Sequence, residues 1–431
     1  MISNRETIAY LYGLERFGIK KGLGRTRRLL AAIGNPQDNL SAIHVAGTNG
    51  KGSASAMLAS VLTNAGFKTG LYTSPHILKF NERIRINWRP ITDNALARAV
   101  REIRRTPESD GATFFEFTTA LAFRYFLDRG SDVVVIETGI GGRWDATNLI
   151  TPLVSVITNV EIDHASMLGN TIEKIAYEKA GIIKKGSPIV TAEKKNKAIE
   201  VIRKEAAKKG SHLFVLGNDF AASPAKGRRH AVDYCGIHED LSAVELSLMG
   251  AHQLRNAACV LAAIELLKGS GLAISRTAIR KGMKTASWPG RLEIIGKRPL
   301  VLLDAAHNPA GAKALALALE GFRFKKLYLV LGIMADKDIA GIAAALAPKA
   351  TMIIAASPET DRAASSAMIE AQASKFGKPV ITAASVKKAC ALAVKLAFGN
   401  DAVCVTGSTF TIAEAKRYFS KRPSNCRDRE P

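Results

Sequence analysis

The stretch HVAGTNGKGSASAM, residues His44–Met57, decides the expected fold. An apolar run, Ile43–Ala46, ends in a glycine-rich turn, and a helical pattern begins at Lys51. At such a turn, backbone N–H groups and the helix dipole converge on an anion. The common phosphate loop is G-x-x-x-x-G-K-[ST], whereas here Gly52 follows the lysine and the hydroxyl of Ser53 comes one position later. The loop alone leaves open both a nucleotide site and a simple chain-reversing turn.

Short apolar runs alternate with amphipathic stretches through the first two thirds of the chain. The predicted strands are Ile43–Ala46, Lys68–Tyr72, Asp132–Glu137, Leu153–Thr158 and Pro188–Thr191, and the predicted helices are Lys51–Ala65, Thr113–Asp128, Thr171–Ile182 and Ala251–Leu267. Strands alternating with helices predict a parallel sheet covered on both faces. We therefore expect an α/β protein that begins with a P-loop-type ATPase domain built on a parallel sheet.

The pattern breaks at TASWPGR, Thr285–Arg291, where Ser, Trp, Pro and Gly follow one another. It then restarts with predicted strands Leu300–Asp304, Leu327–Leu331, Met352–Ala355 and Ala402–Thr406, and with helices such as Ala310–Leu319 and Val386–Ala397. We place a domain boundary near Ala286–Pro289. Residues 1–287 then form the larger domain, and residues 288–431 form a smaller, Rossmann-like α/β domain.

The composition is that of a globular protein, with 431 residues of which 47% are hydrophobic and 23% charged. No apolar run approaches the roughly 20 residues that span a bilayer, and the N-terminus lacks a secretory signal pattern. The cysteines form no C-x-x-C pair; they are Cys235, Cys259, Cys390, Cys404 and Cys426. We expect reduced thiols in a cytoplasmic protein, with no zinc site, no disulfide framework and no membrane partner.

The formal charge of +23 is compatible with nucleic acid, an anionic membrane or polyanionic small molecules as partners. The basic residues are spread along the chain, without a long basic tail and with little aromatic interleaving. A solvated basic surface is therefore favoured over a nucleic-acid site.

A series of short motifs follows the loop in order along nearly the whole chain. They are T-S-P-H (73–76), F-N-E-R-I (80–84), F-F-E-F (114–117), E-T-G-I-G-G-R-W-D-A-T-N (137–148), I-T-N-V-E-I-D-H (157–164), E-K-A-G-I (178–182), H-Q-x-x-N-A (252–257), P-G-R (289–291), D-A-A-H-N-P (304–309), G-I-M-A-D-K-D (332–338) and V-T-G-S (405–408). Together with G-T-N-G-K-G-S, this series resembles the Mur-ligase superfamily. Within it, the series resembles the folate branch of folylpolyglutamate synthases and bifunctional dihydrofolate synthases. Ala305 and Ala165 stand where that family usually has Gly and Thr, which leaves the proposed ligands intact.

The resemblance implies an ATP-dependent amide ligase. In such a reaction a pterin-bearing carboxylate attacks the γ-phosphate of ATP, and the amine of L-glutamate then attacks the resulting acyl phosphate. The resemblance implies ATP and Mg²⁺, allows for a monovalent cation, and assigns ATP and folate to the first domain and glutamate ligation to the second. The acceptor would be dihydropteroate or a reduced folate, and whether both are used or only folates stays open. We expect a monomer.

The resemblance also implies the site residues. Nucleotide contacts are expected from Thr48, Asn49, Gly50, Lys51, Gly52, Ser53, Asn256, Arg291 and Asp304. Metal ligands are expected from Ser53, Ser74, Glu137, His164 and Lys179. Acceptor contacts are expected from Pro75, His76, Thr113, Phe114, Phe115, Glu116, Trp144, Asp145 and Ala146. The groups expected to take part in catalysis are Lys51, His164, Lys179 and His307.

From the residues alone, plainer interpretations stay open. Glu137 ends a predicted strand, where it would either bind a ligand or cap the next loop. Arg291 would equally be a surface arginine, and Asp304 a cap for the helix at Asn308–Pro309. His164 would be a structural loop histidine. The aromatic residues at the start of the helix from Thr113 would either belong to the core or stack on a flat pterin. We expect Phe117 to belong to the core, and Phe114 and Phe115 to stack on the pterin.

Lys179 by itself reads as a solvated helix side chain. The resemblance implies instead that it is carbamylated by CO₂, which turns a cation into an anion whose oxygens suit Mg²⁺ or its waters.

The sequence also bears on two other function classes. A different P-loop NTPase would carry a hydroxyl at position 52, where Gly52 stands. A non-catalytic folate or polyanion binder would lack Lys51, Ser53 or Glu137, and all three are present. A cell-wall ligase with UDP-linked substrates would read G-K-T in the loop.

Overall fold

The computed structural model describes residues 4–18, 20–228 and 230–421, so Cys426 lies outside the described residues. The chain divides into two compact units, which are described separately. Unit 1 holds Met1–Ser247 and Gln253–Ser287, and unit 2 holds Leu248–His252 and Trp288–Pro431.

Unit 1 is built on an eight-stranded sheet with the order β4-β3-β2-β5-β1-β6-β7-β8. The strands are β1 Ala42–Ala46, β2 Thr69–Tyr72, β3 Ile84–Ile86, β4 Arg89–Pro90, β5 Val133–Glu137, β6 Pro152–Ile157, β7 Ile189–Thr191 and β8 Leu213–Val215. From β2 to β8 all neighbours pair in parallel, while β3 and β4 add an antiparallel hairpin at one edge. This confirms the predicted parallel sheet, and places β1, which leads into the glycine loop, in its interior.

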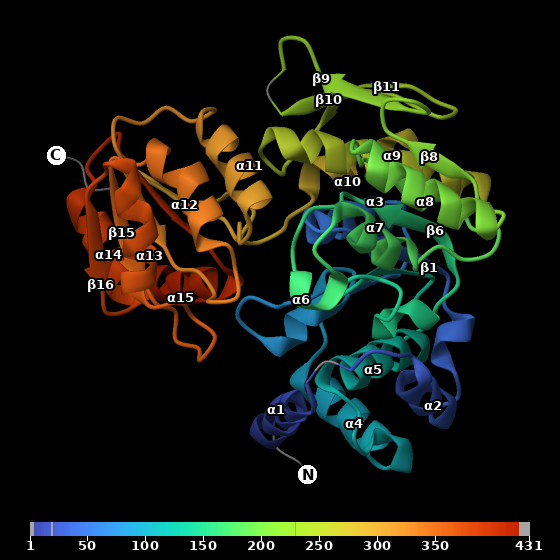
Figure 1. The fold of residues 1–431 in the computed structure, drawn as a ribbon. Coiled ribbons are helices and arrows are strands. Elements are labelled where there is room, and N and C mark those ends of the chain that lie inside the picture. Colours follow the sequence, from blue (N-terminus) through green and yellow to red (C-terminus); the bar gives the residue numbers. More distant parts are fainter. Residues whose placement is uncertain (1–3, 19, 229, 422–431) are drawn as a thin grey trace. The chain divides into compact units, whose positions relative to one another are not determined.

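The helices of unit 1 are α1 Asn4–Gly13, α2 Gly24–Ala32, α3 Lys51–Asn64, α4 Asp93–Arg104, α5 Phe114–Asp128, α6 Ala165–Leu168, α7 Ile172–Ala180, α8 Asn196–Lys208, α9 Ala251–Gly269 and α10 Arg276–Thr285, with short 3₁₀ helices η1 Leu14–Phe17, η2 Pro36–Asn39, η3 Phe80–Arg83, η4 Pro107–Ser109 and η5 Ala146–Leu149. Helices α1, α2, α4 and α5 lie together in Figure 1. Their apolar side chains share one core with Tyr72, Val134 and Ile136 of the sheet. A second core joins α7 and α8 to Ile157 and Ile189.

Helix α3 is buried over almost its whole length because its residues are small. Every side chain from Gly52 to Leu62 is buried, and many of these residues are alanine or serine. The neighbouring α10 approaches so closely that a Cβ on Gly282 would lie 2.4 Å from Cα of Val61. The start of α3, which carries the glycine loop, is therefore fixed by packing rather than by a solvated helix face.

Unit 1 also contains a three-stranded antiparallel sheet in the order β11-β10-β9, which the sequence pattern did not predict. Its strands are β9 Ala221–Pro224, β10 Ala231–Cys235 and β11 Leu241–Glu245.

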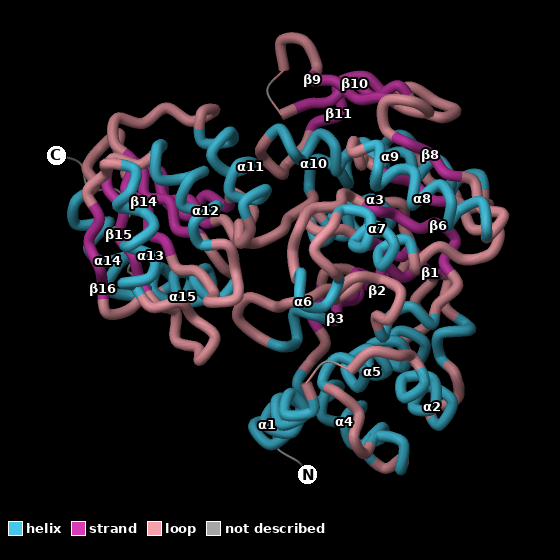
Figure 2. Tube along the Cα trace, viewed as in Figure 1, coloured by secondary structure: helices cyan, strands magenta, loops and turns pink. Residues whose placement is uncertain are grey.

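Unit 2 has a six-stranded sheet with the order β12-β13-β17-β14-β15-β16, parallel except for β12. The strands are β12 Glu293–Lys297, β13 Leu300–Leu303, β14 Leu327–Leu331, β15 Met352–Ala356, β16 Val380–Ala383 and β17 Ala402–Thr406. The helices are α11 Pro309–Leu319, α12 Ile339–Leu346, α13 Ser366–Ala373, α14 Val386–Leu396 and α15 Thr409–Ser420, with η6 Ala347–Lys349 and η7 Ser374–Phe376. Figure 2 shows strands and helices alternating in this unit, which confirms the predicted second α/β fold. Within the described part of the chain, no helix has both the length and the apolar character to cross a membrane.

Candidate active site

The glycine loop joins the end of β1 to the start of α3, as the sequence predicts. Gly50 precedes α3 with φ of +84°, a left-handed backbone conformation that favours glycine. Gly47 is required for a different reason, because a Cβ there would lie 1.9 Å from Oγ1 of Thr158. The loop therefore owes its shape to close contact with the chain that follows β6.

That following segment, residues 158–161, clamps the loop through hydrogen bonds. The N–H of Thr48 donates to the carbonyl of Asn159 over 3.0 Å, and the N–H of Asn49 donates to its side-chain Oδ1 over 2.9 Å. Oγ1 of Thr48 donates to the carbonyl of Glu161 and accepts from its N–H. Asn159 was not among the predicted site residues, although it lies within a quoted motif. The loop is thus held from one side by this segment.

Lys51 lies at the rim of α3 and is half-buried. Its Nζ donates to the carbonyl of Gly47 over 3.1 Å and to that of Thr48 over 3.4 Å. The ammonium group is therefore positioned over the loop, where a bound phosphate would meet it.

Helix α9 contributes two amide side chains to the loop. Nε2 of Gln253 donates to Oγ of Ser53 over 3.3 Å, and Nδ2 of Asn256 donates to Oε1 of Gln253 over 3.0 Å. A Cβ on Gly50 would lie only 2.5 Å from Oδ1 of Asn256. Asn256, a predicted nucleotide contact, thus lies against the loop, and Gln253 is a neighbour that the sequence interpretation missed.

Two predicted metal ligands meet at the carboxyl edge of the unit 1 sheet. The N–H of Ser74, just beyond β2, donates to Oε2 of Glu137 over 3.2 Å. Glu137 is the last residue of β5 and pairs in register with Val45 of β1. It is 4% exposed. The carboxylate therefore lies at the strand end next to the glycine loop, where ligands of parallel sheets collect.

His164 and Lys179 lie in the segment that follows β6. His164 adopts a left-handed φ of +50°, and its N–H donates to Oδ1 of Asp163 over 2.8 Å. Lys179 is 2% exposed, so the plain interpretation of a solvated side chain is wrong. Burial lowers the pKa of Lys179 to about 7, with the charge of Lys51 adding to the shift and those of Asp163 and Asp145 opposing it. These three charged groups therefore lie within electrostatic reach of Lys179.

The described residues contain no group of three or more His, Cys, Asp and Glu side chains arranged to hold a metal ion. Mg²⁺ prefers oxygen ligands and keeps several waters. Serine hydroxyls and a single carboxylate at the sheet edge are suitable oxygen donors for it.

The loop after β5 is organised by Asp145. Its Oδ2 accepts the N–H groups of Gly139 and Ile140, each over 2.9 Å, and its Oδ1 accepts the N–H of Thr147 over 3.1 Å. Burial raises the pKa of Asp145, against these hydrogen bonds. Trp144 is 48% exposed on the same loop, and Ala146 is buried at the start of η5. The indole of Trp144 is therefore exposed, whereas the carboxylate of Asp145 is hydrogen-bonded within the loop.

The start of α5 is a capping box. The N–H of Glu116 donates to Oγ1 of Thr113 over 3.3 Å, and the N–H of Thr113 donates to Oε2 of Glu116 over 2.8 Å. Arg25 adds an ion pair to the other carboxylate oxygen over 3.1 Å. Both predicted acceptor contacts therefore also have a structural role. Phe115 packs against Gly139, where a Cβ would lie 2.6 Å from its ring.

An aromatic group surrounds a buried arginine beside this helix. Tyr12 and Phe114 stack with their ring centroids 6.0 Å apart, and the guanidinium of Arg83 lies 5.0 Å from the Phe114 centroid. Nε of Arg83 donates to Nδ1 of His76 over 2.9 Å, and Nε2 of His76 lies 3.1 Å from the Tyr12 hydroxyl. Burial lowers the pKa of Arg83, and among the described residues no carboxylate forms an ion pair with it. Arg83 is an anion-binding candidate that the sequence interpretation missed.

Phe117 is fully buried in the core, as expected.

The remaining predicted nucleotide contacts lie in unit 2. Asp304, directly after β13, accepts the N–H of Leu292 and that of Ala306, each over 2.9 Å. Burial lowers the pKa of His252; the charge of Asp304 opposes this shift and that of Arg291 adds to it, so the three groups lie close together.

His307 lies beside Asp304, and its Nδ1 is 2.9 Å from the carbonyl of Ala305. The alternative that Asp304 caps α11 is wrong, because the side chain of Asn308 accepts the N–H of Gly311 at that helix start.

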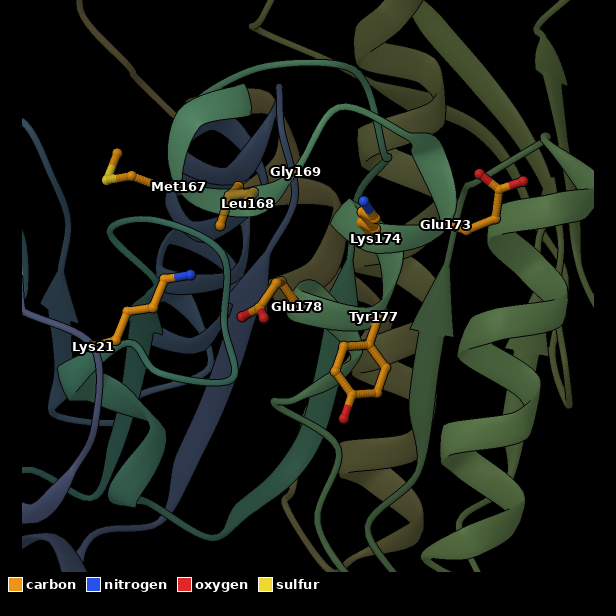
Figure 3. A pocket seen from close by; sticks show the side chains of 8 residues that line it. All are labelled: Lys21, Met167, Leu168, Gly169, Glu173, Lys174, Tyr177 and Glu178. Atoms are coloured by element: carbon orange, nitrogen blue, oxygen red, sulfur yellow. The ribbon is translucent and has the colours of Figure 1, made fainter.

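A shallow pocket lies on the exposed side of α7, and Figure 3 shows its lining. Helices α6 and α7 and the segment before α2 supply its residues, which are Lys21, Met167, Leu168, Gly169, Glu173, Lys174, Tyr177 and Glu178. Burial raises the pKa of Glu178, and the charges of Arg143 and Lys21 oppose this shift. None of the predicted site residues lines this pocket, so it is separate from the glycine-loop site.

Comparison with known proteins identifies relatives along the whole chain. The Mur ligase middle domain matches residues 45–264, and the Mur ligase, glutamate ligase domain matches residues 290–409. Folylpolyglutamate synthase of Lacticaseibacillus casei is 41% identical over 379 residues, which cover 85% of this chain and 88% of that protein. Dihydrofolate synthase/folylpolyglutamate synthase of Bacillus subtilis is 42% identical over 344 residues, which cover 76% and 79%.

Solved structures agree with these matches. Mycobacterium tuberculosis folylpolyglutamate synthase complexed with ADP has a TM-score of 0.89 at 34% identity, covering 97% of this chain and 100% of that one. Escherichia coli FolC in complex with DHPP and ADP has a TM-score of 0.88 at 32% identity, covering 96% and 97%.

Proposed function

Because the chain belongs to the Mur ligase family, in its folylpolyglutamate synthase and dihydrofolate synthase branch, we propose that it joins L-glutamate to dihydropteroate and to the γ-carboxylate of reduced folates. It is an ATP-dependent ligase. The observation that carries the proposal is the clamped glycine loop, with Lys51 over it and the Ser74–Glu137 pair at the same sheet edge. Residues 1–287 would bind ATP and the acceptor, and residues 288–431 would serve glutamate ligation.

The proposed reaction has two steps. A carboxylate oxygen of the acceptor attacks the γ-phosphorus of ATP, and the bond to ADP breaks. The amine of glutamate then attacks the acyl carbon, loses a proton, and displaces inorganic phosphate. Phosphoryl transfer depends mainly on positioning and charge neutralisation. N–H groups of the loop from Thr48 to Ser53 and the ammonium of Lys51 would supply both. Asn256, Arg291 and Asp304 are proposed as further nucleotide contacts.

The proposed metal ligands are oxygens of Ser53, Ser74 and Glu137, with His164 as a further ligand. Bound Mg²⁺ would neutralise charge on the phosphates during transfer. The buried carboxylate of Glu137 and the orientation of the Ser53 hydroxyl by Gln253 support this assignment. A monovalent cation is compatible with the same oxygen-rich edge. His307, in unit 2, is proposed to assist glutamate ligation.

We also propose that Lys179 is carbamylated in the active protein. A carbamate forms from CO₂ and a neutral amine with loss of a proton, and a lysine with a pKa near 7 is partly neutral at physiological pH. Among the described residues, no hydrogen bond or ion pair engages this buried amine. Lys179→Ala would lose activity, and acetate or formate would partly restore it.

The acceptor is proposed to lie along the aromatic group and the loop after β5. Its flat pterin would stack on Phe114 or Trp144, and the buried guanidinium of Arg83 would pair with a carboxylate of the substrate. The other predicted contacts are Pro75, His76, Thr113, Phe115, Glu116, Asp145 and Ala146.

An ¹⁸O transfer experiment tests this mechanism. Dihydropteroate labelled with ¹⁸O in its carboxylate should deliver one label to inorganic phosphate for each amide formed. Unlabelled phosphate would exclude the acyl-phosphate route. Labelled phosphate from folates but not from dihydropteroate would support the alternative function, which is folylpolyglutamate synthesis alone.

A further inference from the structure

A fully buried histidine, His44, lies in the middle of β1 and has no part in the proposed chemistry. It is 0% exposed and stands between Ile136 of β5 and Ser155 of β6 in the parallel sheet. Its Nε2 lies 2.9 Å from Oγ1 of Thr147, which is 103 positions later in the chain. Its Nδ1 is buried and has no hydrogen-bond partner in the part of the chain that the structure describes. A polar ring in an apolar strand interior, held by one specific contact, calls for an explanation.

The direction of the hydrogen bonds follows from the partners. Oγ1 of Thr147 donates to Oδ1 of Asp145 over 2.5 Å, and a hydroxyl has one proton to donate. The threonine hydroxyl therefore gives its single proton to Asp145, and it accepts from the Nε2–H of His44. Burial, aided by the charge of Lys184, lowers the pKa of His44 to about 3, so the ring stays neutral near pH 7.

Asp145 connects this pair of hydrogen bonds to the loop after β5. Its second oxygen accepts the N–H groups of Gly139 and Ile140, so it ties both ends of the loop together. The loop carries Trp144 between these points and begins directly after Glu137. A hydrogen-bonded chain thus runs from the strand that carries the glycine loop to the loop proposed to contact the acceptor.

We propose that His44 is a positioning residue for the acceptor: through Thr147 and Asp145, it holds the loop of residues 138–148 in the conformation that binds the pterin-bearing substrate. This inference rests on the proposed function only for the identity of the ligand. His44 does not touch the substrate. A role as a general base is excluded by its burial, since no reacting group can reach it.

Variants that keep or lose the Nε2 donor test the proposal. In His44→Gln, the amide nitrogen can replace Nε2, so KM for the acceptor should stay within about twofold of wild type. His44→Asn can replace only Nδ1, and His44→Leu replaces neither. Both should raise KM for the acceptor by about three- to tenfold, the effect of one lost hydrogen bond, with KM for ATP unchanged.

The partner and a matched control complete the design. Thr147→Val should raise KM for the acceptor as much as His44→Leu does, whereas Thr147→Ser should resemble wild type. The double variant His44→Leu/Thr147→Val should have a KM close to that of either single variant, because both substitutions break the same chain of hydrogen bonds. The control is Ser155→Ala, which removes a buried hydroxyl beside His44 that donates to the carbonyl of Ile182. It should change thermal stability without changing KM for the acceptor.

Amide hydrogen exchange separates this inference from the proposed function. Exchange of the Gly139 and Ile140 amides should speed up in His44→Leu and Thr147→Val, but not in His44→Gln or Ser155→Ala. Unchanged exchange and unchanged acceptor KM in His44→Leu would overturn the inference and leave a core histidine that only stabilises the fold. If exchange speeds up in His44→Leu and Thr147→Val but the wild-type protein ligates no acceptor, the positioning of the loop is supported and the proposed function is overturned instead.

Discussion

The N–H of Ser74 donates a hydrogen bond to Oε2 of Glu137, and this contact joins the ends of two neighbouring parallel strands. It fixes a buried carboxylate beside the glycine loop. Such a carboxylate is suited to a hard cation.

Glu137→Gln should bind magnesium more weakly while keeping its fold. The amide oxygen still accepts the N–H of Ser74, but a neutral ligand is weaker for Mg²⁺, so the half-saturating Mg²⁺ concentration should rise at least about tenfold. The matched control is Glu265→Gln, a buried carboxylate of α9 that accepts the N–H of His238. An unchanged magnesium titration of folded Glu137→Gln would make Glu137 a structural residue.

Lys51→Ala should lose ligation by a factor on the order of 100 to 1000, because a charge that faces the transferred phosphoryl group is removed. The fold should persist, since the lysine is half-buried at the helix rim and its ammonium donates to carbonyls of its own loop. Thermal unfolding and product formation should be measured together, with Lys68→Ala as an exposed control. A folded Lys51→Ala protein with wild-type turnover would rule out the phosphate-loop assignment.

Lys179 should give a pH-dependent carbamate. Because its pKa is lowered to about 7, the neutral amine increases as pH rises through that value, and the carbamate signal with ¹³C-bicarbonate should grow from about pH 6 to about pH 8 at constant dissolved CO₂. Lys184, whose pKa burial lowers to about 8, provides the control. The signal should persist in Lys184→Ala and vanish in Lys179→Ala. A signal that survives in Lys179→Ala would belong to another amine.

The same shift sets the pH dependence of stability for the unmodified protein. The unfolded lysine titrates at about 10.5, so between the two pKa values the unfolded state binds more protons, and stability should rise with pH there. Lys179→Met should remove that slope, as measured by urea unfolding in CO₂-free buffer. An identical slope in wild type and Lys179→Met would show that burial does not shift this amine.

Arg83→Met should raise KM for the acceptor by a factor on the order of 30, because a buried substrate carboxylate would lose its charged partner. KM for ATP should not change. Arg83→Lys should recover only part of the loss, since an ammonium lacks the planar fork of donors. The control is Arg85→Met, a partly buried neighbour on β3 whose Nε donates to a backbone carbonyl. Equal effects of Arg83→Met and Arg85→Met would point to a structural role for both.

The strands and helices around the glycine loop were predictable because they are apolar runs bounded by turn residues. The prediction of β1 differs from the structure by one residue, and β14 and β17 match residue for residue. The small sheet of β9, β10 and β11 was missed. Its first strand, AASP, is largely exposed and shows no apolar alternation, so nothing local marks it as a strand.

The candidate site was predictable where a motif carries it and not where a distant contact does. Gln253 lies 200 positions from Ser53, and His44 lies 103 positions from Thr147, so only the folded chain shows these pairs. The burial of Lys179 was likewise invisible, because a lysine in a polar helical stretch looks solvated until the helix is packed.

The central claim is that this chain forms an amide bond between glutamate and a pterin-bearing carboxylate. The most direct measurement supplies ATP, Mg²⁺ and ¹⁵N-labelled glutamate with either dihydropteroate or a reduced folate, and follows both acceptors by mass spectrometry. We predict that each acceptor gains one labelled glutamyl residue per ADP released, and that neither does so with Lys51→Ala. Folded protein that binds ATP and yet adds glutamate to neither acceptor would contradict the claim.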